Sequence, residues 1–533
     1  MIDFDGLTIG QAFGAVAARW PDRPFLIAAA TRETPLRTLT YADAELRIAQ
    51  VANDLSAAGY GPGARVAVLM GTSPEYYIVK LALARIGASC VPVNPDYRPG
   101  EIAYLLDDSR AVLAITDPSR IDQMSLGVAE AGASPPVILF DEIVAAPKIG
   151  EPAGAPDETT EASLLYTSGT TGRPKGCILS HRYELQCGAA YSVIGGAASF
   201  GDGCEVHLNP LPSFHINAGV VTLFGAMLRG NCMAQPERFS ATTWWRDVAE
   251  TGATTFNYLG VIISVLMADR EVGKEALGAL RCGIGAGVEP ALHVAFEQRF
   301  GIPLIELWGM TEMCRITNMA DKPRMIETRA FGRPRVDLEV RVVDGDDKDV
   351  LPGAPGEMVM RHSSETPREG FFDGYLNKPE ATAEAWRGGW FHTGDTASMD
   401  EAGVLYFIDR AKNIIRRSGE NIAAAEVENI LLEHEAVDQV ACLAAPDEVR
   451  EEEVMACIVL APGAERSEAT ARALFAHCDA ALAYFKAPGW VLFVDALPVT
   501  GTQKLVKHKI FAQGVDPRDG AFDLRALKRR TRA

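Results

Sequence analysis

The sequence has little of what marks zinc-binding, membrane-spanning or nucleic-acid-binding proteins. Its ten cysteines and nine histidines are scattered without a CxxC pair, so it predicts no structural zinc site. The longest apolar run without a charged residue, 218–228, is too short to span a bilayer. Basic residues number 51 against 70 acidic ones, and the net charge of −19 argues against nucleic acid as a partner.

The amino terminus also lacks the basic residues of a signal peptide, because its first five residues, MIDFD, carry two aspartates. Together with cysteines that show no disulfide pattern, this predicts a cytoplasmic protein with reduced thiols. A length of 533 residues favours two to four domains, and a hydrophobic content of 48% is typical of a globular protein. The sequence leaves open whether the chain forms a homodimer.

Short apolar segments such as 65–70 alternate with helical ones such as 75–86 over roughly the first 310 residues. This alternation predicts the α/β class, with mainly parallel sheets covered by helices. From about residue 332, valines alternate with charged residues in 336–344 and 356–361. That pattern predicts antiparallel strands and a small β-barrel.

The sequence pattern changes again after Asp409. It predicts a small α+β domain, with a helix that starts near Ala424. We therefore divide the chain into two domains. Residues 1–411 form a large domain of βα-layered subdomains plus the barrel, and residues 412–533 form the small domain.

Residues 164–176, LLYTSGTTGRPKG, carry the strongest signal. An apolar segment that predicts a strand is followed by hydroxyl side chains alternating with glycines, and then by a lysine. Glycines let backbone N–H groups turn toward an anion, hydroxyls add donors, and lysine adds a charge. The predicted polyphosphate ligands are Thr167, Ser168, Gly169, Thr170, Thr171, Gly172 and Lys175. The stretch is not a Walker A loop, because Pro174 precedes the lysine and Gly176 follows it.

The TSGTTG-x-PKG string resembles the phosphate loop of the adenylate-forming superfamily, which includes acyl-CoA synthetases, luciferases and the adenylation domains of peptide synthetases. The resemblance covers essentially the whole chain. It implies that a carboxylic acid attacks the α-phosphate of ATP, with Mg²⁺ as cofactor, to give acyl-AMP and pyrophosphate. Coenzyme A then takes the acyl group and releases AMP, and the small domain rotates between the two half-reactions.

Two further strings add to the implied nucleotide site. GIGAGVEP, 283–290, predicts a strand and a glycine turn that a flat base can approach, although such a turn alone is weak evidence. WGMTE, 308–312, puts a carboxylate after a strand, where it could hold Mg²⁺, although a Thr-Glu pair is also an ordinary helix start. By resemblance, Thr311 contacts the α-phosphate and Glu312 binds magnesium. The implied adenosine contacts are Gly285, Ala286, Gly287, Val288, Glu289, Trp308, Gly309 and Met310.

Three motifs follow toward the carboxyl end. WFHTGD, 390–395, ends in Asp395, which can accept hydrogen bonds from both ribose hydroxyls; an Asx turn is the alternative interpretation. IDRAKNII, 408–415, resembles the family's hinge motif, in which Arg410 reaches the ribose or α-phosphate and Lys412 absorbs the rotation. The next stretch resembles the loop that lines the pantetheine tunnel, which implies CoA contacts by Ser418, Gly419 and Glu420.

Lys504 occupies the position of the family's adenylation lysine, although Gln503 stands where the family has glycine. Such a lysine stabilises the charge that carboxylate and phosphate share as the bond forms. His215 aligns with the aromatic gate of the acyl pocket, with a packed histidine as the alternative. The other implied acyl-pocket residues are Asn217, Tyr258 and Gly260.

Three functions stay open at this point. The first is a freestanding acyl-CoA ligase, whose layout looks closest to ligases for carnitine, crotonobetaine or medium-to-long fatty acids. The second is an adenylating enzyme that loads a carrier protein, or a luciferase-like oxygenating relative. The third is a non-catalytic nucleotide sensor. The short stretch after Lys504 favours the first over a multidomain synthetase, and the complete set of charged groups argues against the sensor.

Overall fold

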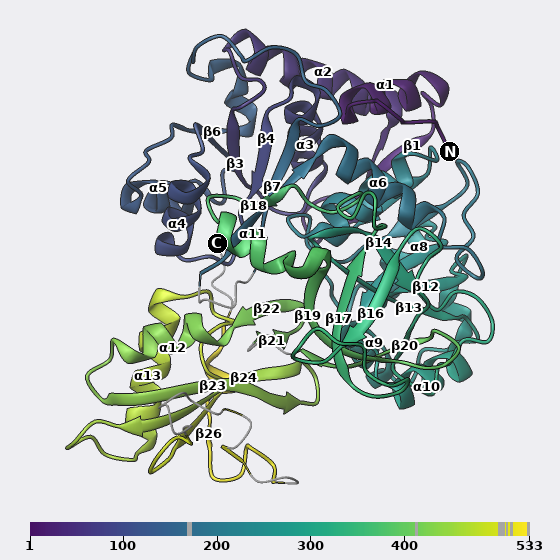
Figure 1. Ribbon diagram of the computed structural model, residues 1–533. Coiled ribbons are helices and arrows are strands. Elements are labelled where there is room, and N and C mark those ends of the chain that lie inside the picture. Colours follow the sequence, from purple (N-terminus) through teal and green to yellow (C-terminus); the bar gives the residue numbers. More distant parts are fainter. Residues whose placement is uncertain (168–172, 411–413, 499–506, 508–509, 512–514, 530–533) are drawn as a thin grey trace.

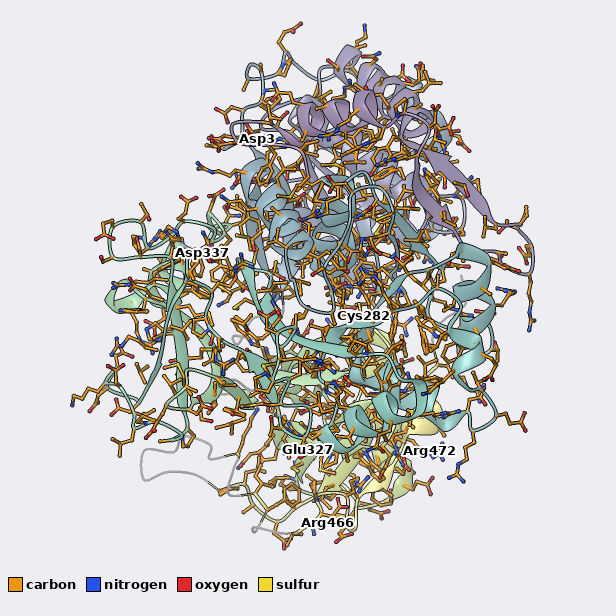
Figure 2. The ribbon with its side chains drawn as sticks, turned by 90° about the vertical axis from the view of Figure 1, so that its right-hand side faces the viewer. Asp3, Cys282, Glu327, Asp337, Arg466 and Arg472 are labelled. Carbon is orange, nitrogen blue, oxygen red and sulfur yellow. The ribbon has the colours of Figure 1, made fainter. Side chains whose placement is uncertain are left out.

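The computed structural model describes residues 1–167, 173–410, 414–498, 507, 510–511 and 515–529 (Figure 1). Three sheets build the chain up to residue 410, and a fourth builds the carboxyl-terminal part at the lower left of Figure 1. In Figure 2, the buried Cys282 lies in the middle of the molecule, and the exposed Arg466 lies at its lower margin. The arrangement confirms a mixed α/β fold with a large first part and a smaller second part.

A seven-stranded sheet contains the strand that leads into the phosphate loop. Its order is β18-β8-β7-β4-β3-β5-β6. The strands are β3 (Arg65–Leu69), β4 (Ser89–Pro92), β5 (Leu113–Thr116), β6 (Val137–Leu139), β7 (Glu161–Thr167), β8 (Lys175–Ser180) and β18 (Gly374–Tyr375). Helices alternate with strands β3 to β6. They are α2 (Tyr41–Ala57) before β3, α3 (Pro74–Ile86) before β4, α4 (Pro99–Ser109) before β5 and α5 (Ile121–Glu130) before β6, and η1 (Phe140–Ala145) follows β6. β3, β4, β5 and β6 run parallel, as the alternating pattern predicts, whereas β8 turns back antiparallel to β7.

An eight-stranded sheet carries the adenosine and acyl motifs. Its order is β14-β13-β12-β11-β9-β10-β1-β2. The strands are β1 (Pro24–Ala28), β2 (Arg37–Thr40), β9 (Val206–Leu208), β10 (Cys232–Gln235), β11 (Thr255–Leu259), β12 (Cys282–Ala286), β13 (Leu304–Met310) and β14 (Met313–Asn318). Its helices are α1 (Ile9–Arg19), α6 (His181–Ser192), η2 (Asn217–Thr222), α7 (Leu223–Met227), α8 (Trp244–Thr251), α9 (Gly260–Ala268), η3 (Lys274–Leu277) and α10 (Pro290–Phe300).

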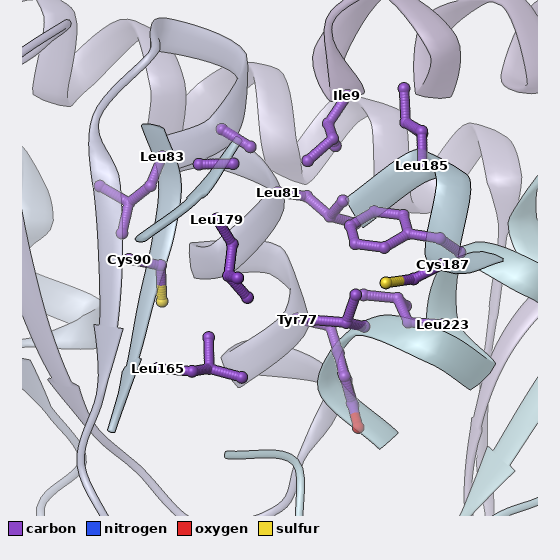
Figure 3. Close-up of a cluster of buried hydrophobic side chains, with 14 of the residues drawn as sticks. Ile9, Tyr77, Leu81, Leu83, Cys90, Leu165, Leu179, Leu185, Cys187 and Leu223 are labelled. Atoms are coloured by element: carbon purple, nitrogen blue, oxygen red, sulfur yellow. The ribbon is translucent and has the colours of Figure 1, made fainter. Parts of the chain in front are cut away.

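The largest core joins these two sheets. In Figure 3, Leu81 of α3, Leu185 of α6 and Leu223 of α7 point toward one another, with Leu165 and Leu179 of the β7–β8 hairpin beside them. Burial of such aliphatic side chains contributes about 1.5–3 kcal/mol each. This core therefore holds the phosphate-loop sheet in place against the sheet that carries the adenosine motifs.

A five-stranded antiparallel sheet follows in the order β15-β20-β19-β17-β16. The strands are β15 (Ala330–Gly332), β16 (Glu339–Val343), β17 (Gly356–Arg361), β19 (Phe391–Met399) and β20 (Leu405–Arg410), with α11 (Pro379–Ala385) and η4 (Arg387–Gly389) before β19. The antiparallel prediction is confirmed. Among the described residues the sheet is an open path, because β15 pairs with β20 and not with β16, so it does not close into the expected barrel. The three-residue β15 instead lies against β13 and β14 of the eight-stranded sheet.

The carboxyl-terminal part has its own sheet and core. Its strands are β21 (Ile414–Arg417), β22 (Glu420–Ala423), β23 (Val437–Asp447), β24 (Glu451–Leu460), β25 (Trp490–Phe493) and β26 (Phe522–Asp523). Its helices are α12 (Ala424–Leu432), α13 (Glu468–Ala481) and η6 (Arg525–Leu527). Val427, Leu474 and Val491 pack together inside it. Lys412 and Lys504 lie outside the described residues.

No helix in the described ranges is long and apolar enough to cross a bilayer. The apolar run 218–228 forms the π-helix η2 followed by α7, both inside the large core. A π-helix is uncommon and is found mostly at functional sites.

Candidate active site

The β7–β8 hairpin brings the two ends of the predicted phosphate loop together. Thr167, the last residue of β7, pairs with Lys175, the first of β8. Ser168, Gly169, Thr170, Thr171 and Gly172 lie outside the described residues. The Lys175 ammonium lies 4.9 Å from the ring centre of Tyr375 in β18. Because an aromatic face attracts a cation, Tyr375 holds Lys175 beside the loop.

Glu312 joins this group from the turn between β13 and β14. The Tyr375 hydroxyl donates a hydrogen bond of 2.8 Å to Glu312 Oε1. Burial and the Glu312 carboxylate raise the pKa of Tyr375, so this hydroxyl stays protonated. The neighbouring Thr311 carbonyl accepts a bond of 2.7 Å from Tyr183. Since Met310 pairs with Met313 across the two strands, Thr311 and Glu312 form a hairpin tip and not a helix start.

Asp395 meets the tryptophan of the WGMTE string. The Trp308 indole N–H donates to Asp395 Oδ2 at 2.8 Å, and both side chains are buried. Asp395 lies within β19, opposite Arg410 of β20, so the Asx-turn interpretation is wrong. The indole bond joins the eight-stranded sheet to the five-stranded sheet. It therefore fixes the relative position of two motifs that are far apart in the sequence.

The glycine turn after β12 is held by the partly buried carboxylate of Glu306. Glu306 of β13 accepts from the Gly287 N–H at 3.0 Å, the Val288 N–H at 3.3 Å and the Tyr258 hydroxyl at 2.8 Å. Gly287 has a φ of +80°, a conformation that favours glycine. A Cβ at Gly285 would lie 2.1 Å from the Tyr258 carbonyl oxygen. The turn is thus shaped by glycines and anchored by Glu306, while the exposed Glu289 pairs with Arg329.

We expect this turn to respond to pH. Burial raises the pKa of Glu306 to about 7, so it is roughly nine-tenths ionised at pH 8 and one-tenth at pH 6. The protonated carboxyl gains a hydrogen and loses one acceptor site for the N–H groups of Gly287 and Val288. Loss of one bond of about 1 kcal/mol predicts roughly fivefold weaker adenosine binding at pH 6 than at pH 8.

Calorimetric titration with adenosine, which has no phosphate to titrate, measures this effect. Glu306→Gln cannot ionise and should show a flat profile. The same pH slope in the parent and in Glu306→Gln would contradict the assignment.

His215 and Asn217 lie at the start of the π-helix segment. The His215 Nε2 atom lies 3.1 Å from Glu420 Oε1, which joins an acyl-pocket candidate to a CoA-loop candidate. The Asn217 side chain accepts from Asn209 and Asn257 at 2.9 and 3.3 Å. The His215 side chain is 38% exposed, so it is not a packed core histidine. Its exposure and its contact with Glu420 are compatible with the acyl-gate interpretation.

The loop 418–420 packs against the end of β11. Ser418 and Gly419 have φ values of +51° and +88°. A Cβ at Gly419 would lie 2.2 Å from Leu259 Cδ1, so a larger residue would displace the Leu259 side chain or the loop, and the positive φ itself favours glycine. At the same edge, a Cβ at Gly260 would lie 1.9 Å from the Gly287 carbonyl oxygen. The glycine loop of the second domain therefore faces the predicted acyl pocket.

The buried Lys486 makes a further contact between the two parts of the chain. Lys486 Nζ lies 2.5 Å from Glu101 of α4 and 2.7 Å from Glu426 of α12. Burial raises the pKa of Glu101, while Lys486 opposes that shift. Arg98 adds a bond of 3.2 Å to the Leu482 carbonyl. Because Glu101 and Glu426 come from different parts, these contacts are specific to this arrangement.

Sequence reasoning missed Tyr375, Glu306 and Lys486. No motif contains them, and each acts on a residue that is distant in the sequence. Glu306 offered a weak signal, since it is a carboxylate in an otherwise apolar strand.

The fold and the site together define an enzyme of the adenylate-forming class, because these contacts link the strings predicted to bind phosphate, adenosine and ribose. The model of the AMP-binding enzyme family matches residues 13–376, and that of the AMP-binding enzyme C-terminal domain matches residues 426–504. The chain belongs to the AMP-binding enzyme family.

Several relatives resemble the chain over nearly its whole length. It is 32% identical over 517 residues to a sulfoacetate–CoA ligase of Cupriavidus necator, covering 94% of this chain and 97% of that protein. It is 30% identical over 502 residues to a crotonobetaine/carnitine–CoA ligase of Citrobacter koseri, covering 90% and 94%. Among solved structures, an o-succinylbenzoate CoA synthetase of Bacillus subtilis has a TM-score of 0.80 at 24% identity, over 94% of this chain and 98% of that one, a likeness of fold.

Proposed function

We propose that this chain is an AMP-forming acyl-CoA ligase. In the first half-reaction a carboxylate oxygen of the acid attacks the α-phosphorus of ATP and pyrophosphate leaves. In the second, the sulfur of CoA attacks the carbonyl carbon of acyl-AMP, the thiol proton is lost, and AMP leaves with the bonding electrons. The observation that supports the proposal best is the Trp308–Asp395 bond, because it joins the string 308–312 to the string 390–395, which we propose contact the α-phosphate and the ribose.

Each motif has a physical role in this proposal. Lys175 supplies a cation beside the phosphate loop, and Thr311 supplies a hydroxyl near the α-phosphate. Asp395 accepts hydrogen bonds from the ribose, and the turn 285–289 receives the adenine. Arg410 adds a fixed cation, and Lys504 stabilises the charge that develops during adenylation.

Glu312 fits Mg²⁺. This ion prefers one or two carboxylates with phosphate oxygens. The described residues include no cluster of three His, Cys, Asp or Glu side chains that could hold a metal ion. With Glu312 as one carboxylate ligand, phosphate oxygens and water would supply the other donors. When bound, Mg²⁺ neutralises charge on the phosphates. Tyr375 holds the Glu312 carboxylate in place for this role.

We expect Glu312→Gln to raise the Mg²⁺ concentration needed for half-maximal acyl-AMP formation by at least about 10- to 100-fold. That is the loss in metal affinity expected when only an outer partner of a metal ligand is removed. Added Mg²⁺ should partly restore the rate. The measurement is pyrophosphate release against Mg²⁺ concentration. Tyr375→Phe keeps the carboxylate and serves as the control with a smaller shift; an unchanged Mg²⁺ curve for Glu312→Gln would remove this residue from the metal site.

The two domains are proposed to alternate. With loop 418–420 against Leu259 and His215, the arrangement suits thioester formation. Rotation about Lys412 would break the contact of Lys486 with Glu101 and bring Lys504 to the nucleotide. A cytoplasmic location stays a prediction from the sequence, and a homodimer stays an open possibility.

The experiment is a two-stage assay with a panel of carboxylic acids. Acid and ATP alone should release pyrophosphate, and CoA should then convert acyl-AMP to acyl-CoA and AMP, detected by mass. Adenylation without transfer to CoA would indicate another acceptor, such as a carrier protein. Nucleotide binding without pyrophosphate release from any acid would indicate a sensor.

A further inference from the structure

A buried hydrogen-bond network lies behind His215. Asn209 follows β9 and Asn257 lies in β11, and neither side chain is exposed. Both donate their amide N–H groups to Asn217 Oδ1, at 2.9 and 3.3 Å. Asn209 also donates to Thr222, and Tyr191 donates to Asn257 Oδ1 at 3.1 Å.

The network determines which way the Asn217 amide faces. The backbone N–H of Leu211 donates to Asn209 Oδ1 at 2.9 Å, and a backbone N–H can only donate. Asn209 must therefore present its nitrogen to Asn217, and Asn217 must present its oxygen in return. Its oxygen accepts two bonds, so its NH₂ group faces the opposite way.

The NH₂ group of Asn217 is available to a ligand. It has no hydrogen-bond partner among the described residues, and Asn217 is partly exposed, unlike Asn209 and Asn257. His215 is two residues away and contacts Glu420 of the CoA loop. Two residues span at most about 7 Å, so the backbone of Asn217 lies close to that of His215, the predicted gate of the acyl pocket.

We propose that Asn217 selects the acid substrate, and that this substrate is a short carboxylic acid carrying a hydrogen-bond acceptor toward its other end. This inference rests on the proposed function. An alkyl chain would leave two N–H donors buried without partners, whereas a carbonyl, carboxylate or sulfonate oxygen accepts from them. A site built to hydrogen-bond its substrate discriminates strongly against an analogue that lacks the partner atom.

Asn217→Asp gives a matched test. One carboxylate oxygen can still accept from Asn209 and Asn257, so the internal network is kept. The second oxygen replaces the NH₂ group, so an outward donor becomes an anionic acceptor. Asn217→Leu has similar volume and offers neither.

The measurement is kcat/KM for acyl-AMP formation with two matched sets of acids: butanoate, malonate and β-alanine, then pentanoate, 4-oxopentanoate and 4-aminobutanoate. In the parent, malonate or 4-oxopentanoate should exceed its alkyl and amino counterparts by about tenfold or more. In Asn217→Asp, kcat/KM should be higher for β-alanine and 4-aminobutanoate than for malonate and 4-oxopentanoate, the reverse of the parent. In Asn217→Leu, kcat/KM should be highest for butanoate and pentanoate. Ratios between acids are compared within one variant, so a general loss of activity does not disturb the result.

The assays distinguish failure of this inference from failure of the proposed ligase function. Activity with equal or greater preference for butanoate and pentanoate, or ratios that neither variant changes, would overturn this inference and leave the ligase intact. No acyl-AMP from any acid would overturn the proposed function and this inference together.

Discussion

Gly419→Val is expected to lower the rate of thioester formation by about 100-fold while leaving acyl-AMP formation near the parent rate. The new side chain would meet Leu259 Cδ1 at 2.2 Å, and its φ of +88° is strained for a β-branched residue. The branched side chain and the strained φ displace the loop or push Leu259 toward the acyl pocket, and a displacement of about 1 Å at a reacting centre can cost about 100-fold. The measurement compares acyl-CoA formation from purified acyl-AMP with pyrophosphate release from ATP.

Gly463→Val is the matched control for backbone strain. Gly463 lies in the same domain with a φ of +93°, but nothing lies within 4 Å of an added Cβ. It should lower the unfolding temperature without a selective effect on thioester formation. If Gly419→Val damages both half-reactions equally, loop 418–420 does not serve the second one.

Lys504→Ala is expected to lower acyl-AMP formation by about 10²–10³-fold and to spare thioester formation from supplied acyl-AMP. The magnitude follows from removing one group that stabilises charge only in the transition state. The sparing follows from the arrangement described above, in which loop 418–420 faces the pocket. Single-turnover measurements of the two half-reactions separate the effects.

Lys507→Ala controls for the loss of a positive charge in the same segment. Lys507 pairs with Glu428 at 2.6 Å and donates to the Cys442 carbonyl, so its role lies within the small domain. It should leave the adenylation rate largely unchanged. Equal losses in both half-reactions of Lys504→Ala would contradict the assignment and point to a role in folding.

The sequence supplies the candidates for the nucleotide site, because its motifs are contiguous strings whose residue types suit particular ligands. The glycines and hydroxyls of 167–172, followed by Lys175, predict anion binding. The alternation of apolar and helical segments likewise predicts parallel sheets, and β3, β4, β5 and β6 confirm it. Closure of a barrel could not be predicted, since it depends on the pairing of β15 and β16, two distant strands.

The sequence by itself therefore determined the family, the α/β class and the candidates for phosphate, ribose and metal binding. The tertiary structure decided which partners the candidate residues have: Trp308 contacts Asp395, Tyr375 contacts Glu312, and Asn209 and Asn257 contact Asn217. The reason is physical. A motif is a property of neighbouring residues, whereas the direction of an amide and the partner of a carboxylate are set by strand order and register over long separations.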